Sequence, residues 1–211
     1  MNRILANRWT KVLVFLLCVV PLFMLGWWAY RGELTANPIE FITHHTGDWT
    51  LRFLLITLCV TPLRKLANLP NLIKLRRMFG LYAFFYGFLH FGITYLWLDK
   101  FFDIHEIMKD ILKRPYITVG FTGFMLMVPL AITSTWGWVR RLGGKRWQRL
   151  HRLVYFTALA GVIHYYWLVK SDVRLPLMYG AILTVLMAYR VRVWLRKGAI
   201  RKPEPAAAIR A

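Results

Sequence analysis

Residues 78–98 read MFGLYAFFYGFLHFGITYLWL, an uncharged run that is long enough to cross a lipid bilayer as a single helix. With five other apolar stretches it predicts six membrane spans, at about residues 11–30, 46–63, 78–98, 116–136, 150–169 and 175–195. The composition agrees, because 58% of the 211 residues are hydrophobic and 16% are aromatic. The sequence therefore predicts an all-α polytopic membrane protein, a six-transmembrane-helix bundle that occupies residues 11–196.

Two of these spans need a separate argument. The second has a short clean apolar stretch, from Phe53 to Leu63, and it crosses the membrane only if Asp48 and Arg52 reach the interface. The first follows basic residues, as a secretory signal does. Its apolar core is too long for a signal and no small-x-small cleavage site follows it, so we expect a membrane anchor.

The distribution of charge predicts the orientation. If the N-terminus is cytoplasmic, segments 1–11, 64–77, 140–152 and 190–210 face the cytoplasm and hold 21 of the 29 basic residues, while eight of the nine acidic residues lie on the other side. This is the positive-inside pattern. We therefore expect a cytoplasmic N-terminus at residues 1–10 and a cytoplasmic tail at residues 197–211, which is disordered because it has few residues that could bury surface.

The net charge of +20 also raises the question of nucleic acid. Nucleic-acid binding would need the basic residues on one soluble face, interleaved with exposed aromatic side chains. Here they are divided among the ends of membrane spans, where anionic lipid accounts for them. We expect membrane lipid as a partner and no nucleic acid.

Three histidines, His90, His151 and His164, lie within the predicted helices. An ionisable side chain inside a membrane span is costly and indicates a functional site. Imidazole is a common axial ligand of heme iron, and helical bundles build cofactor sites from side chains on facing helices. His90 would lie about 12 Å and His164 about 8 Å below the outer ends of their spans. Because these depths are similar, we expect the two to ligate one outer heme.

Small residues accompany both histidines at spacings of three or four. The two helical stripes are Gly80, Ala83 and Gly87 with His90, and Thr157, Ala160 and Gly161 with His164. A porphyrin needs room against the backbone, which such residues supply. The alternative is ordinary packing of small residues between membrane helices.

His151 precedes His164 by thirteen residues, so on one ideal helix it would be about 20 Å deeper and on a different side. We expect a separate inner site for it, or alternatively an interfacial histidine beside Arg149 and Arg152. His44 and His45 are expected mainly as solvated loop residues.

The other polar residues indicate no chemistry of their own. His105 is assigned no role, and Cys18 and Cys59 are expected as small buried hydrophobic residues, since they have no metal-ligand spacing. The sequence also lacks a Gly-rich phosphate loop, a nicotinamide fingerprint and an activated nucleophile. It predicts an electron-transfer subunit rather than a catalytic one. A membrane scaffold or proton-relay transporter without heme is an alternative.

Particular segments resemble a known family. Residues 76–90, and residues 147–166 with the run WQRLHRLVY, are similar to the ferric-reductase-like transmembrane domain that NADPH oxidases share. More narrowly, KRPYITVG at residues 113–120 and LAITST at residues 130–135 resemble the MsrQ (YedZ) family. The resemblance covers roughly residues 10–196.

The resemblance implies a heme-binding subunit in the bacterial inner membrane, the partner of a periplasmic molybdopterin enzyme that reduces methionine sulfoxide in oxidised proteins. It also implies heme b and FMN, with electrons from the quinone pool or a cytoplasmic flavin reductase. An independent transmembrane ferric or quinone reductase remains an alternative.

Carried over residue by residue, the family's heme histidines fall on His90, His151 and His164. The larger superfamily has two hemes, but its fourth histidine falls near Arg76, Arg77 or Met78 here. A second heme would need His151 and a weaker ligand such as Met78. One heme is therefore expected and two are possible. The FMN has no assigned site, although the inner arginines could bind its phosphate.

Overall fold

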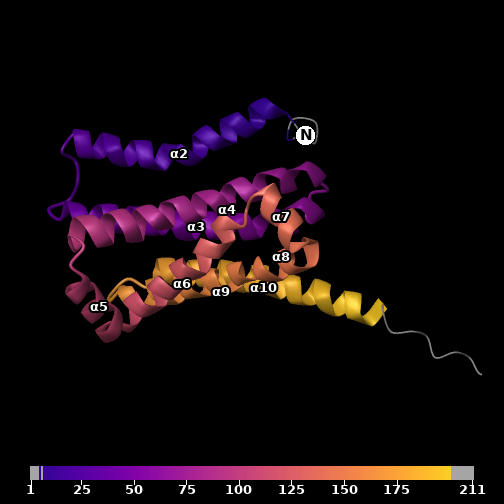
Figure 1. The fold of residues 1–211 in the computed structure, drawn as a ribbon. Coiled ribbons are helices and arrows are strands. Elements are labelled where there is room, and N and C mark those ends of the chain that lie inside the picture. The colour runs from indigo at the N-terminus through magenta and orange to yellow at the C-terminus, as the bar shows by residue number, and fades with distance from the viewer. Residues whose placement is uncertain (1–4, 6, 201–211) are drawn as a thin grey trace, which may run out of the picture.

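A computed structural model describes residue 5 and residues 7–200, and every regular element in this part of the chain is helical (Figure 1). The elements in chain order are α2 (Arg8–Tyr30), α3 (Pro38–Leu66), the short 3-10 turn η1 (Pro70–Leu72), α4 (Ile73–Phe88), the π-helical η2 (Leu89–Asp99), α5 (Ile104–Lys113), α6 (Pro115–Ile132), α7 (Trp136–Leu142), α8 (Gly144–Leu150), α9 (Leu153–Leu168) and α10 (Arg174–Ile200). The expected tail at 197–211 falls largely outside the described residues, and α10 continues to Ile200.

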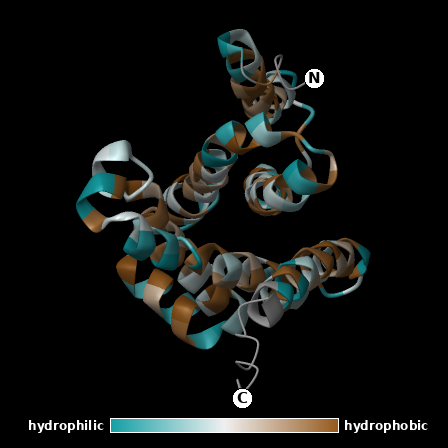
Figure 2. Cartoon of the chain, turned by 90° about the vertical axis from the view of Figure 1, so that its right-hand side faces the viewer, coloured by the Kyte–Doolittle hydropathy of each residue, from teal (hydrophilic) through white to brown (hydrophobic). Residues whose placement is uncertain are grey.

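Four of the described helices are long and apolar enough to cross a membrane: Arg8–Tyr30, Pro70–Asp99, Pro115–Ile132 and Arg174–Arg196. They leave large apolar side chains exposed, as in Phe23 (71%) and Val185 (68%). Figure 2 shows hydrophobic residues on the outer sides of the helices as well as between them. The protein is thus a multi-pass, all-helical membrane protein.

The other two expected spans are α3, which lies at the centre of the bundle, and α9, which packs in the bundle but leaves Phe156 (62%) and Leu159 (50%) exposed. α3 packs against α4, η2, α9 and α10, and α9 packs against α6. Neither helix is both long and apolar enough to count as a candidate span. Polar residues such as Asp48 and Arg52 lower the hydropathy of α3, and α9 is short, with 16 residues. Figure 1 shows both helices running the length of the bundle beside the others.

Several helix ends differ from the expected spans. α3 begins at Pro38 rather than 46, where the Asn37 side chain caps it by accepting from the Glu40 amide, and α10 continues to Ile200 rather than 195. α6 ends at Ile132 rather than 136, because Thr133 and Ser134 donate their hydroxyls back to carbonyl groups of the last helical turn and Thr135 caps α7. α9 begins at Leu153 rather than 150, because the chain turns at residues 151–152.

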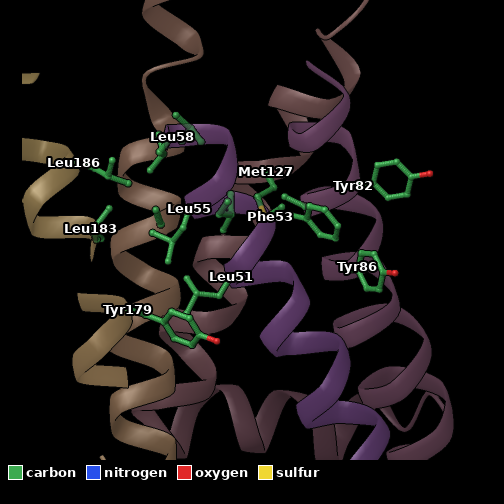
Figure 3. Packing of buried hydrophobic residues seen from close by; sticks show 14 of the residues in the cluster. Leu51, Phe53, Leu55, Leu58, Tyr82, Tyr86, Met127, Tyr179, Leu183 and Leu186 are labelled. Carbon is green, nitrogen blue, oxygen red and sulfur yellow. The ribbon is translucent and has the colours of Figure 1, made fainter. Parts of the chain in front are cut away.

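The core lies along α3, where buried side chains such as Leu51, Leu55 and Leu58 meet residues from α4, α9 and α10 (Figure 3). α2 attaches to this core through the fully buried Tyr86. The Tyr86 hydroxyl donates to the Cys18 carbonyl at 2.9 Å and accepts from the Leu22 amide at 3.2 Å, so it bridges successive turns of α2.

Candidate functional site

A cavity of about 260 Å³ lies between η2, α3, α6 and α9, at the end of the bundle that carries α5. Both His90 and His164 line it. The walls are apolar and partly aromatic, with Phe91, Phe121 and Phe124 among them. Glycines from α3, α4, α6 and α9 also line it, namely Gly47, Gly87, Gly120, Gly123 and Gly161. The cavity is thus wider beside these glycines, where no side chain projects from the backbone.

The structure brings His90 of η2 and His164 of α9 together across this cavity. Their ring centres are 6.1 Å apart and their planes are inclined by 74°. Two imidazoles that bind one metal ion from opposite sides, each at about 2 Å, have ring centres about 6 Å apart. The spacing therefore suits a single metal ion between the rings.

The hydrogen bonds of both rings leave the same nitrogen available. His90 Nδ1 lies 2.9 Å from the carbonyl oxygen of Thr43, and His164 Nδ1 lies 2.6 Å from that of Tyr116. A carbonyl oxygen can only accept, so each Nδ1 carries the proton and each Nε2 presents a lone pair. Histidines that bind metals usually donate their second ring nitrogen in this way.

Two glycines allow these hydrogen bonds to form. Gly47 follows Thr43 by four residues and Gly120 follows Tyr116 by four, so each glycine lies one turn beyond the carbonyl that accepts from a histidine. A Cβ atom would lie 3.0 Å from the His90 ring at Gly47 and 2.6 Å from His164 Nδ1 at Gly120. The imidazoles thus rest directly on the backbones of α3 and α6.

This donor set suits heme better than a bare metal ion. Among the described residues there is no group of three or more His, Cys, Asp and Glu side chains that could hold a metal. Two imidazoles alone give too few ligands for zinc, whereas a porphyrin supplies four nitrogens and needs only axial ligands from the protein. The apolar walls fit its faces, so the residues present fit heme.

His151 lies elsewhere, at the end of α8. It stacks on Trp147 with ring centres 3.8 Å apart, and its Nε2 lies 3.1 Å from Thr133 Oγ1. It does not line the cavity. The chain turns at His151, so His151 and His164 do not lie on one ideal helix as expected, although His151 is separate from the cavity as expected.

Other expectations about the site need changes. His44 and His45 lie on α3 rather than in a loop; His44 lines the cavity, and His45 Nε2 lies 3.1 Å from the Pro21 carbonyl. Met78 is partly buried and packs against the core. Of the inner arginines, Arg190 bonds to backbone carbonyls of α3 and α10. No FMN site is assigned.

A buried carboxylate lies beside the mouth of the cavity. Asp110, on α5, is 4% exposed and pairs with Lys100 and Arg114, each at 3.1 Å, while Tyr95 donates its hydroxyl to it at 3.3 Å. Burial opposes its ionisation, but the hydrogen bond from Lys100 and the charges of Lys100 and Arg114 outweigh burial and hold the pKa of Asp110 below its usual value. This cluster joins α5 to η2 and to the start of α6.

The residues that support the histidines could not be predicted from the sequence. Gly47, Gly120 and the carbonyls of Thr43 and Tyr116 are far from their partners along the chain. The only available signal was a glycine inside an apolar helix, which in a membrane protein also marks ordinary helix packing. The contact itself required the fold.

Comparison with known proteins identifies the family. A family model described as "Ferric reductase like transmembrane component" matches residues 46–162. The protein-methionine-sulfoxide reductase heme-binding subunit MsrQ of Herminiimonas arsenicoxydans is 55% identical over 183 residues, which are 86% of this chain and 84% of that protein. The subunit of the same name from Caulobacter vibrioides is 49% identical over 193 residues, 92% of this chain and 90% of that protein. The chain therefore belongs to the MsrQ family, within the ferric-reductase-like membrane proteins.

Proposed function

We propose that this chain is a membrane cytochrome b that relays electrons to a periplasmic molybdopterin methionine-sulfoxide reductase, which repairs oxidised periplasmic proteins. The observation that carries the proposal is the pair of imidazoles 6.1 Å apart, each with Nδ1 bonded to a backbone carbonyl. The names of the relatives support it, since they are heme-binding subunits of a protein-methionine-sulfoxide reductase. Heme b, when bound, supplies the one-electron chemistry that side chains lack.

The protein's own residues hold and shield the cofactor. His90 and His164 would hold the heme iron through Nε2, and the backbone carbonyls of α3 and α6 fix the tautomer of both rings. The aromatic residues of η2 and α6 exclude water from the faces of the site. His151 is the candidate for a less certain inner site, with one heme expected and two possible.

The membrane arrangement is part of the proposal. Six helices, including α3 and α9, would cross the bacterial inner membrane, with both termini cytoplasmic. The positive-inside pattern supports this orientation, and α2 begins at the end of the bundle where α10 finishes (Figure 1). The heme site then lies in the periplasmic half.

Electrons must enter and leave through other molecules. We expect quinones or a cytoplasmic flavin reductase as the donor, with FMN only because the family resemblance implies it. The exit is the periplasmic face formed by residues 31–47, 99–115 and 170–174. This face carries both acidic and basic side chains, which suit weak, salt-sensitive docking of a redox partner.

Heme content tests the ligands. His90→Ala and His164→Ala should each remove most of the heme from the purified protein, measured as pyridine hemochrome with flavin extraction on the same samples. His151→Ala should keep the outer heme and slow reduction from the inner side. Full heme retention in both cavity variants would exclude the pairing, and a wild-type protein without a Soret band would favour a scaffold or proton-relay transporter.

Reoxidation kinetics test the relay. The reduced protein should be reoxidised by the molybdopterin reductase only when a sulfoxide substrate is present, and more slowly as salt concentration rises. Decay of the reduced Soret band at the same rate without the reductase would favour an independent ferric or quinone reductase.

A further inference from the structure

The helix α5 divides its surface into three sectors. Ile107, Asp110 and Ile111 face the protein, where Asp110 is buried and the other two are partly buried. A second sector is polar and includes the exposed Lys109 and Lys113. The third sector is apolar and turned away from the rest of the chain.

This apolar sector is a stripe of three side chains spaced by four residues. Ile104, Met108 and Leu112 are 74%, 48% and 77% exposed. At 100° per residue they lie on one side of the helix, adjacent to Ile107 and Ile111. A ten-residue helix is marginal in water on its own, and leaving half of its apolar surface in water would weaken it further.

The chain that leads into α5 extends the stripe. Phe101 and Phe102 are 78% and 60% exposed, and both have positive φ, 48° and 59°. This backbone conformation is unfavourable for bulky residues. The turn therefore holds two aromatic side chains in an exposed position despite an unfavourable backbone conformation.

The position of α5 identifies what covers the stripe. One end follows Asp99, where a candidate membrane span ends, and the other meets Pro115, where the next one begins. Only residues 100–103 separate the first span from α5, so the helix lies level with the span ends (Figure 1). Trp97, near the end of the first of these spans, is 51% exposed, so exposed apolar side chains lie on both sides of residues 100–103.

We infer that α5 is an interfacial helix whose stripe of Ile104, Met108 and Leu112 inserts into the lipid of the leaflet at this end of the bundle. The three sectors match such a site, with protein beside the helix, hydrocarbon beneath it and water above it. A protein partner would need about 800 Å² on this chain for a stable interface, far more than three side chains provide. The charged sector stays in water, free for the docking proposed above.

Site-directed spin labelling in lipid nanodiscs tests this inference, and it does not depend on heme binding. Full-length chains that carry Cys18→Ala and Cys59→Ala would be labelled singly at Leu112→Cys or Ile104→Cys, with Lys109→Cys as the matched control on the polar sector. The positions are exposed, so the labels do not disturb the core. Monodisperse elution confirms that each variant is folded.

We expect the ratio of oxygen to nickel-chelate accessibility to be several-fold higher at positions 112 and 104 than at 109. Equal nickel access at all three positions would overturn the inference. Nickel access at 112 and 104 that disappears only when the periplasmic reductase is added would also overturn it, because the stripe would then be a protein-docking surface.

Discussion

At the scale of single residues, the site depends on the contact between a ring and a bare backbone. Each imidazole donates to a carbonyl that already belongs to a helix, and such a carbonyl can be reached only if the next turn lacks a side chain. Gly47 and Gly120 meet this requirement for His90 and His164. The remaining glycines of the cavity provide width and make no such contact.

Substitution of Gly120 should therefore displace His164. A Cβ at this position would be 2.6 Å from Nδ1, so Gly120→Ala should weaken heme retention by roughly 10- to 100-fold, as loss of a supporting contact does at metal sites. Gly47→Ala, with contacts at 3.0 Å, should have a smaller effect in the same direction.

Gly80→Ala is the matched control for that measurement. Gly80 also lies in a helix of the bundle, but a Cβ there meets only Thr57 at 3.7 Å, an ordinary contact. Its heme-to-protein ratio should equal that of the wild type. Equal losses in Gly80→Ala and Gly120→Ala would mean that glycine acts through helix packing in general.

The pairing of His90 and His164 shows what sequence can predict about a site. Helix rise and the span boundaries gave both residues a similar depth, and the structure places their rings 6.1 Å apart across one cavity, with planes inclined by 74°. The family followed from the resemblance of particular segments, and the multi-pass, all-helical character followed from the apolar stretches. Their supporting groups did not follow, because they depend on contacts between residues nearly fifty positions apart.

At the scale of elements, α5 and the ends of α6 and α9 were not foreseen. Residues 104–113 place apolar and charged residues at a helical period, but the segment is too short and too charged to be one of the expected membrane spans. The turn after Ile132 depends on the hydroxyl groups of Thr133 and Ser134, which bond to nearby carbonyls. The chain turns again at residues 151–152, before Leu153. Hydropathy detects neither turn, so the expected spans ran through them.

Acid should release α5. The pKa of Asp110 in the folded protein lies below its unfolded value of about 3.9, so its ion pairs stabilise the fold above that pH and are lost as pH falls below it. Hydrogen exchange of the α5 amides should rise between pH 5 and pH 3, after correction for the intrinsic pH dependence of exchange.

Asp110→Asn should raise exchange in α5 already at neutral pH, by about 1–3 kcal/mol of local opening free energy, and should remove the acid-dependent rise. Glu106→Gln serves as the control, since Glu106 forms only an exposed pair with Lys109 and should change exchange little. If exchange in α5 still rises at low pH in Asp110→Asn, other carboxylates cause the acid response.

At the scale of the whole molecule, charge and helix arrangement lead to one topology. α7 and α8 lie at the end of the bundle where α2 begins and α10 finishes, and the segments at this end carry most of the basic residues (Figure 1). The opposite end carries α5 and the cavity lined by His90 and His164. An even number of crossings is therefore expected.

Reporter fusions test this topology. Alkaline phosphatase fused after Ile200 should be inactive and a cytoplasmic fluorescent reporter at the same position active. The matched fusion after Ser171, between α9 and α10, should give the opposite result. An active phosphatase at Ile200 would exclude six spans.

The hydrogen bonds of the two imidazoles have a genetic consequence. Their acceptors are peptide carbonyls, which every amino acid possesses, so no substitution at Thr43 or Tyr116 deletes the acceptor itself. In a saturation library, these two positions should tolerate many replacements, while Gly47 and Gly120 tolerate almost none. The residues that accept the hydrogen bonds and the residues whose identity matters are thus different. Substitutions that abolish the site should be found at the glycines.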